Sequence, residues 1–247
     1  MMKLIFGILL MFLFAGCKDR ETNAQCNYCC DEFYKKLETK KSFFLVAVDR
    51  SGSVPNSHTV PIHNFVIKNI INSPAYGFGS KFFSSVFASD ASAVSWNSPH
   101  HEISPLTIPK EIKKKLETET TKGCKDAQKF IDAEMSKMNS SPTSFLRQTF
   151  NQQLPSGLKN NRTKVLSVIK SMMEWSEFNA NSSAKLITFF VTDYKFSDFK
   201  NVQDYLKGKR LRNVTVVQTH PTDNISSGPR GEFLNLLKAH GVLVLTQ

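Results

Sequence analysis

The sequence predicts an α/β fold, in which a mainly parallel open sheet forms the middle of three layers and helices cover both of its faces. Short runs of β-branched, aromatic and other apolar residues alternate with longer amphipathic segments. This alternation is typical of parallel strands joined by helical crossovers, which are right-handed. The chain has 247 residues, enough for one substantial core after an apolar N-terminal segment is set aside. No internal repeat or long low-complexity stretch argues for a second domain.

The expected elements begin at residue 42 and continue to the end of the chain. Strands are predicted at 42–49, 82–88, about 93–96, 185–192, 213–218 and 242–245. Helices are predicted at about 59–72, 110–118 and 124–138, then as a short segment between Pro142 and Pro155, and at 163–178, 197–207 and 229–240. Gly241 is suited to end the last helix. Residues 97–160 are the least regular part and are expected to be an elaboration of the domain.

An acidic and hydroxyl-rich motif follows the first strand. Asp49, Ser51 and Ser53 alternate with Arg50 and Gly52 directly after an apolar run. In open α/β sheets, ligands bind at the carboxyl ends of the strands. Carboxylate and hydroxyl oxygens suit a hard cation such as Mg²⁺. Taken alone, the motif is equally consistent with a turn in which Asp and Ser cap the next helix.

Two later fragments extend this pattern. Thr163 lies just ahead of an amphipathic helix, and Asp193 ends the apolar strand that closes with Thr192. Together with Asp49-Arg50-Ser51-Gly52-Ser53, these fragments resemble the metal-ion-dependent adhesion site of the von Willebrand factor A-type domain family. The resemblance covers residues 42–247 and implies a Rossmann-like sheet, with the strand at 93–96 pairing antiparallel to 82–88 at the edge.

The resemblance also implies the roles of the site residues. Ser51, Ser53 and Thr163 would contact Mg²⁺, Mn²⁺ or Ca²⁺, and Asp49 and Asp193 would balance its charge. Thr143 and Thr149 are alternative candidates for the role of Thr163. Family members usually have Gly after the last Asp, whereas Tyr194 follows here, so a different turn is expected. Asp198 is expected either to support Asp193 or to place a negative charge at the start of a helix.

The N-terminus resembles the signal peptide and lipobox of a bacterial lipoprotein. Lys3 precedes an apolar run over residues 4–14 that is too short to span a bilayer, and small residues lead into Cys17. The resemblance implies that residues 1–16 are removed and that Cys17 is acylated. Residues 17–41 would then form a tether, and acyl chains would hold the protein on a membrane without spanning it. The expected location is the cell envelope, on the outer membrane, facing either the periplasm or the cell surface.

Four further cysteines fit an exported protein, because disulfides persist in oxidising compartments. They are Cys26, Cys29, Cys30 and Cys124. Up to two disulfides are expected, including one between the cysteine-rich tether and Cys124, although free thiols remain an alternative. Adjacent cysteines pair only with strain. No second Cys or His pair at zinc spacing follows, and His100 and His101 are expected to be exposed loop residues.

The formal net charge is +11, but no nucleic-acid motif accompanies it, and a solvated basic surface is expected. The resemblance implies a binding module rather than an enzyme, with an acidic side chain of a protein partner completing the coordination of the ion. The competing interpretation is a structural lipoprotein of an envelope, secretion or conjugation assembly, with a degenerate metal site. A magnesium-dependent phosphatase of the haloacid dehalogenase type is disfavoured, because its second Asp would fall at Ser51.

Overall fold

A computed structural model describes residues 38–50, 59–87, 94–117, 121–151, 163–217, 219 and 228–245. At residues 59–61, 116–117, 121–124 and 150–151 it describes the backbone alone. The chain divides into two compact units, one of Met1–Thr39 with Pro105–Asn139 and one of Lys40–Ser104 with Ser140–Gln247. Cys17, Cys26, Cys29 and Cys30 lie outside the described residues, as does the side chain of Cys124, so lipidation and disulfide pairing stay predictions.

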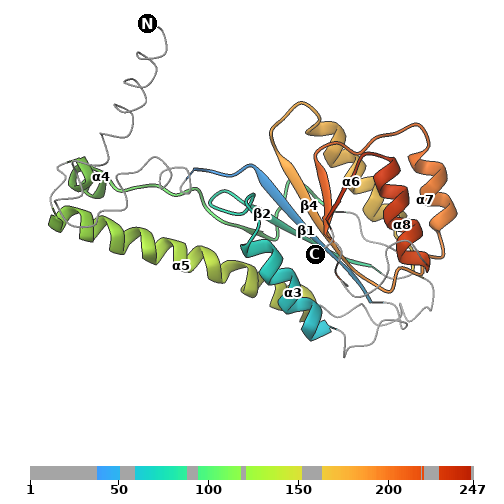
Figure 1. The fold of residues 1–247 in the computed structure, drawn as a ribbon, viewed down its shortest axis with the longest axis horizontal. Coiled ribbons are helices and arrows are strands. Elements are labelled where there is room, and N and C mark those ends of the chain that lie inside the picture. The colour runs from blue at the N-terminus through green and yellow to red at the C-terminus, as the bar shows by residue number, and fades with distance from the viewer. Residues whose placement is uncertain are drawn as a thin grey trace, which may run out of the picture. The chain divides into compact units, whose positions relative to one another are not determined.

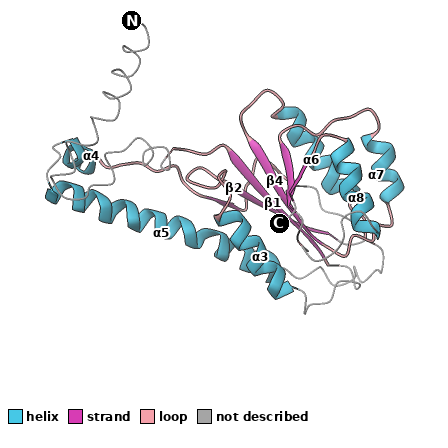
Figure 2. Ribbon diagram, in the orientation of Figure 1, coloured by secondary structure: helices cyan, strands magenta, loops and turns pink. Residues whose placement is uncertain are grey.

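The larger unit contains a six-stranded sheet with the order β3-β2-β1-β4-β5-β6 (Figures 1 and 2). Its strands are β1 (Ser42–Asp49), β2 (Lys81–Phe87), β3 (His101–Glu102), β4 (Lys185–Val191), β5 (Val214–Val217) and β6 (Leu243–Leu245). The short edge strand β3 pairs antiparallel with β2, and every other neighbouring pair is parallel. The predicted fold class is therefore confirmed.

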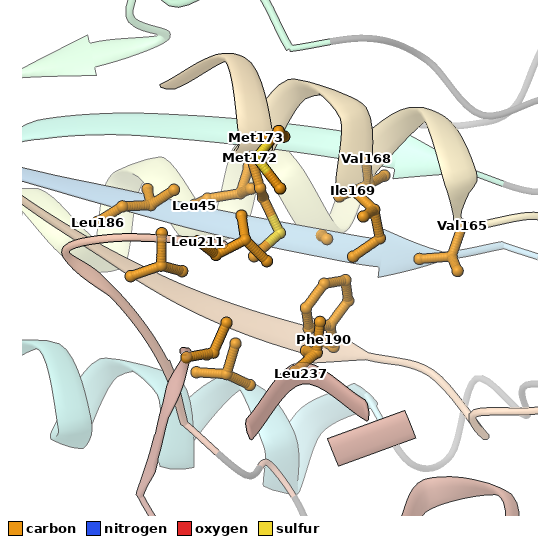
Figure 3. Close-up of a cluster of buried hydrophobic side chains, with 14 of the residues drawn as sticks. Leu45, Val165, Val168, Ile169, Met172, Met173, Leu186, Phe190, Leu211 and Leu237 are labelled. Atoms are coloured by element: carbon orange, nitrogen blue, oxygen red, sulfur yellow. The ribbon is translucent and has the colours of Figure 1, made fainter. Parts of the chain in front are cut away.

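Helices cover both faces of this sheet (Figure 1). Helix α3 (Thr59–Ile71) lies on one face, and α6 (Leu166–Phe178), α7 (Phe199–Leu206) and α8 (Gly228–Ala239) lie on the other. Strand β1 is buried on both faces, as an unbroken apolar strand should be at the centre of such a sheet. Leu45 of β1, Ile169 of α6 and Leu237 of α8 belong to one apolar core (Figure 3).

The antiparallel edge strand lies further along the chain than the sequence predicts. Val94 and Trp96 are not in a strand, because they bond to helix α6 instead. The Val94 amide donates to Ser171 Oγ at 3.1 Å, and Trp96 Nε1 donates to the Ser171 carbonyl at 3.0 Å. His101, expected in an exposed loop, is half-buried in β3 and pairs with Phe82.

Helix α5 (Thr121–Asn151) is a single 31-residue helix that passes through Pro142. The prediction of two helices broken at Pro142 is therefore wrong. An interior proline removes one backbone hydrogen bond and usually kinks or ends a helix. Beyond Pro142, Phe145 and Leu146 are buried within the larger unit, and the Phe145 ring centroid lies 5.3 Å from that of Phe82. This packing stabilises the helix after the proline.

The smaller unit contains α4 (Lys110–Glu117) and the first part of α5. Within it, Lys115 Nζ lies 2.7 Å from Asp126 Oδ2. Among the described residues, no helix is long and apolar enough to cross a membrane.

Candidate functional site

Asp49, Thr192 and Asp193 lie where the strand order of the sheet reverses. The chain passes from β1 outward to β2 and β3, then returns to the other side of β1 as β4. The carboxyl ends of β1 and β4 therefore flank a topological switch point, which is where open α/β sheets bind ligands. Asp49 ends β1, and Thr192 and Asp193 follow β4 directly.

Asp49 holds two hydroxyl groups at this point. Its side chain is buried, with the residue only 1% exposed. Thr192 Oγ1 donates to Asp49 Oδ2 at 2.7 Å, and Thr163 Oγ1 donates to Asp49 Oδ1 at 3.5 Å. The second contact is long for an O–H···O hydrogen bond. The Thr163 hydroxyl is therefore held near the carboxylate without a tight bond that an incoming ligand would have to break.

A clamp between two loops positions Thr163. The Ser197 amide and hydroxyl both donate to the Thr163 carbonyl, at 2.8 and 3.0 Å. Asp198 accepts from the Val165 amide at 3.0 and 3.1 Å and from the Leu166 amide at 2.9 Å. These amides begin helix α6, so the carboxylate satisfies free donors and complements the positive end of the helix.

Asp198 is thus a cap for a helix 32 residues away in sequence. At its own helix, α7, it is the N-cap residue but makes no side-chain capping bond. Because Asp198 caps α6 from outside, the helix starts at Leu166 and leaves Thr163 in the preceding loop. The prediction that the helix begins at residue 163 is therefore wrong. Because Thr163 is outside the helix, its hydroxyl can contact Asp49.

Asp193 presents one carboxylate oxygen that no described residue satisfies. Its Oδ1 accepts from the Lys195 amide at 3.1 Å, which closes a local turn. Its Oδ2 is buried and has no hydrogen-bond partner in the described part of the protein. A buried carboxylate oxygen without a donor is costly, so an unpaired oxygen here is a place where a cation would be stabilised.

Tyr194 adopts the left-handed conformation that a glycine would favour. Its φ is 63°, yet its side chain is 1% exposed. The hydroxyl donates to the Phe190 carbonyl at 3.2 Å, and burial raises the pKa of the phenol. The ring centroid lies 5.9 Å from that of Phe233 of α8. The aromatic side chain therefore fastens the turn after Asp193 to the core.

The structure separates the candidate residues into three groups. Asp49 and Thr163 are in contact, and Asp193 follows the Thr192 that bonds to Asp49. Ser51 and Ser53 lie outside the described residues. Thr143 and Thr149, the alternatives to Thr163, are both within helix α5, and Thr149 donates to the Phe145 carbonyl at 3.1 Å. Of the three threonines, Thr163 is the one with a hydrogen bond to Asp49.

Sequence reasoning missed the contact of Thr192 with Asp49 and left the role of Asp198 open. The signal for Thr192 is its position: a hydroxyl at the end of a strand that neighbours β1. Thr192 Oγ1 also accepts from the Tyr194 amide at 3.1 Å, so it links Asp49 to the turn after Asp193. No sequence pattern near Asp198 points to a helix that begins 32 positions earlier.

The donor set at this edge consists of carboxylate and hydroxyl oxygens. Among the described residues, no group of three or more His, Cys, Asp or Glu side chains could hold a metal ion. A cation here would therefore depend on hydroxyl groups as well as on Asp49 and Asp193. Such a set suits Mg²⁺ or Mn²⁺ better than zinc or copper, which prefer nitrogen and sulfur.

Comparisons with known proteins give structural matches at low sequence identity. No protein-family model matches the sequence, and no curated protein sequence matches it. Proximal thread matrix protein 1 from the mussel byssus is a structural match with a TM-score of 0.40 and 15% identity. The alignment covers 85% of this chain and 44% of the mussel protein, so this chain spans less than half of that protein. The TFIIH p34 N-terminal domain matches with a TM-score of 0.33, 11% identity, and coverage of 81% and 98%. At these scores the likeness carries no argument about function.

Proposed function

We propose that this protein is a lipid-anchored lipoprotein of the bacterial envelope whose domain of the von Willebrand factor A type binds a protein partner through a divalent cation. The unpartnered Asp193 Oδ2, one residue after the Thr192 that bonds to Asp49, is the observation that carries this proposal. The lipid anchor is inferred from the sequence around Cys17. The cation is inferred from the carboxylate and hydroxyl oxygens at the ends of β1 and β4.

The residues present fit a divalent cation. Asp193 Oδ2 and the Thr163 hydroxyl would hold it, and Asp49 would stabilise its charge through the hydroxyls that it bonds. Ser51 and Ser53 complete the set by resemblance. A bound ion would supply a coordination position that a carboxylate from outside can occupy.

The surroundings of the site favour an acidic partner. Lys164 and Lys195 are exposed, and Lys164 directly follows Thr163 while Lys195 lies two residues after Asp193. Their positive charges attract a carboxylate and accelerate its encounter with the edge. The loop clamp of Ser197 and Asp198 holds Thr163 in place before a ligand arrives, which lowers the entropy cost of binding.

Calorimetric titration of the full chain with Mg²⁺ or Mn²⁺ tests the proposal. Asp193→Asn is expected to weaken metal binding at least about tenfold, because a neutral amide replaces the anionic oxygen that lacks a partner. Asp204→Asn is the matched control, since Asp204 is exposed in the last turn of α7, whereas Asp198 is at its start, and it should bind like wild type. Equal metal affinity in both variants would refute the proposed site.

A further inference from the structure

The edge of the sheet opposite the candidate site carries a group of exposed cations, called here the basic edge. Its side chains lie at the amino ends of β1, β4 and β5, in segments that the backbone ties together. The Lys185 amide donates to the Lys41 carbonyl at 3.1 Å, and the Leu186 amide donates to the Asn213 carbonyl at 3.0 Å. The exposed members are Lys41, Lys185, Lys207, Lys209, Arg210 and Arg212.

Salt bridges do not neutralise these cations within the residues that the structure describes. In the described part of the chain, none of the six makes a salt bridge. Exposed carboxylates on the neighbouring helices are Glu174 and Glu177, near the end of α6, and Asp204, near the end of α7. The basic edge therefore keeps unpaired positive charge toward solvent.

Hydrogen bonds hold the loop between α7 and β5 in place, and one of its cations contacts an aromatic ring. The Asn213 side chain donates to the carbonyls of Asn179 and Ser182, at 3.0 and 3.2 Å. Ser176 Oγ donates to the Arg212 carbonyl at 3.0 Å. Lys209 Nζ lies 3.4 Å from the centre of the Tyr205 ring, a cation–π contact. A surface organised in advance loses less conformational entropy when it binds.

An unpartnered aromatic side chain accompanies the basic edge. Phe178 ends helix α6 and is 89% exposed. It immediately precedes Asn179, whose carbonyl accepts from Asn213 in the basic loop. Figure 1 shows the loop after α6 and the loop after α7 at the same end of the sheet. A cationic surface with a protruding aromatic ring suits the boundary between headgroups and acyl chains of a bilayer.

The dimensions favour an extended anionic surface over a small anion. Neighbouring strands lie about 4.8 Å apart, so cations at the ends of three strands spread over roughly 10 Å or more. Phe178 adds an apolar contact that a purely ionic polymer does not require.

We propose that the basic edge docks on a bilayer that contains anionic lipids, with Phe178 inserted among the headgroups. Because the strands are parallel, the carboxyl ends of β1 and β4 then face away from the membrane. This orientation would present Asp49 and Asp193 to a partner. The presentation to a partner rests on the proposed function, whereas the docking on lipid rests on the basic edge alone. The basic edge would supplement a lipid anchor by holding the domain in one orientation.

The test uses the full chain with Phe178→Trp and vesicles that contain brominated acyl chains, which quench nearby tryptophan. Quenching is read as the difference from the parent chain, whose Trp175 is 1% exposed. We expect quenching with vesicles of phosphatidylglycerol and phosphatidylcholine, loss of quenching in high salt, and little with phosphatidylcholine alone. The readout is local to residue 178, so an N-terminal apolar segment that binds vesicles by itself cannot produce it.

A matched pair of triple variants, each in the Phe178→Trp background, tests the cations. Each Lys or Arg at an anionic surface contributes a factor of about five in affinity. Replacing Lys185, Arg210 and Arg212 by Gln should therefore weaken vesicle binding about 100-fold. The control replaces Lys68, Lys129 and Lys200 by Gln, which removes the same charge from exposed positions elsewhere and should have a much smaller effect.

Equal binding by both triple variants, or no added quenching in the Phe178→Trp chain, would overturn the proposal. Binding to heparin or DNA that depends on the basic edge, without vesicle binding, would also overturn it in favour of an anionic polymer. If Asp193→Asn loses metal binding but its quenching is unchanged, the result supports lipid docking as independent of the metal site. A failure of lipid docking is thus distinguishable from a failure of the proposed function.

Discussion

Replacing Tyr194 by Gly is expected to destabilise the protein, although Gly is the residue that the turn conformation favours. The φ of 63° costs a non-glycine residue about 1–2 kcal/mol, which Gly would relieve. The Tyr194 side chain, however, is 1% exposed and packs against Phe196 and Phe233. Losing a large buried aromatic side chain costs about 3–5 kcal/mol. The net loss in the free energy of unfolding is therefore about 1–4 kcal/mol.

Two further substitutions at Tyr194 separate packing from strain. Tyr194→Phe removes only the bond to the Phe190 carbonyl, which also accepts from Thr219 at 2.7 Å, so it should cost about 1 kcal/mol or less. Tyr194→Ala loses the packing and keeps the strain, so it should be less stable than Tyr194→Gly by about 1–2 kcal/mol. Urea denaturation with unchanged m-values measures the series. A Gly variant as stable as wild type would refute the reasoning.

Three other predictions concern different parts of the molecule. Asp198→Ala should lower the free energy of unfolding by about 2 kcal/mol, because two amides at the start of α6 lose their acceptor. Chemical denaturation measures this loss, with Asp204→Ala as the control. Equal effects of the two substitutions would contradict the prediction. Burial lowers the pKa of His101 below 6.5. As the pH falls, His101 is therefore protonated in the unfolded chain before it is protonated in the folded chain, and stability should decrease below pH 6.5. In thermal unfolding between about pH 7 and 5, His101→Gln should lose less stability than wild type. Some loss should remain, because burial also lowers the pKa of His63. Identical pH profiles of the two proteins would show that His101 does not contribute. Cys17→Ser should leave an unprocessed precursor or a soluble species, and a variant processed and membrane-bound like wild type would disprove lipidation at this residue.

Local patterns predicted the centre of the sheet well. The apolar run that forms β1 and the run that forms β4 are buried at nearly every position, and no other element suits such segments in a chain of this size. The edge was harder to predict. Val94 and Trp96 have strand-forming side chains, but bonds to Ser171 of a distant helix decided their conformation. Helix α5 likewise continues past Pro142 because residues beyond the proline are packed.

In the candidate site, too, local sequence patterns do not predict contacts between side chains that are distant in the sequence. Asp49, Thr163 and Asp193 were identifiable because each lies beside a strand or helix with a clear pattern. The contacts of Thr192 and Asp198 were not, since they depend on which loops meet after folding. The turn at Tyr194 was predicted to differ, but only the burial of its ring explains how a left-handed tyrosine is tolerated.

The central claim is that the carboxyl ends of β1 and β4 hold a divalent cation. Anomalous diffraction from crystals of the protein grown with Mn²⁺ tests it directly, because manganese is the scatterer and its position identifies its ligands. The account predicts a peak within coordination distance of Asp193 Oδ2 and the Thr163 hydroxyl, and no peak at that place in Asp193→Asn crystals. Saturating Mn²⁺ with no peak at this edge, or a peak that persists in Asp193→Asn, would contradict the account.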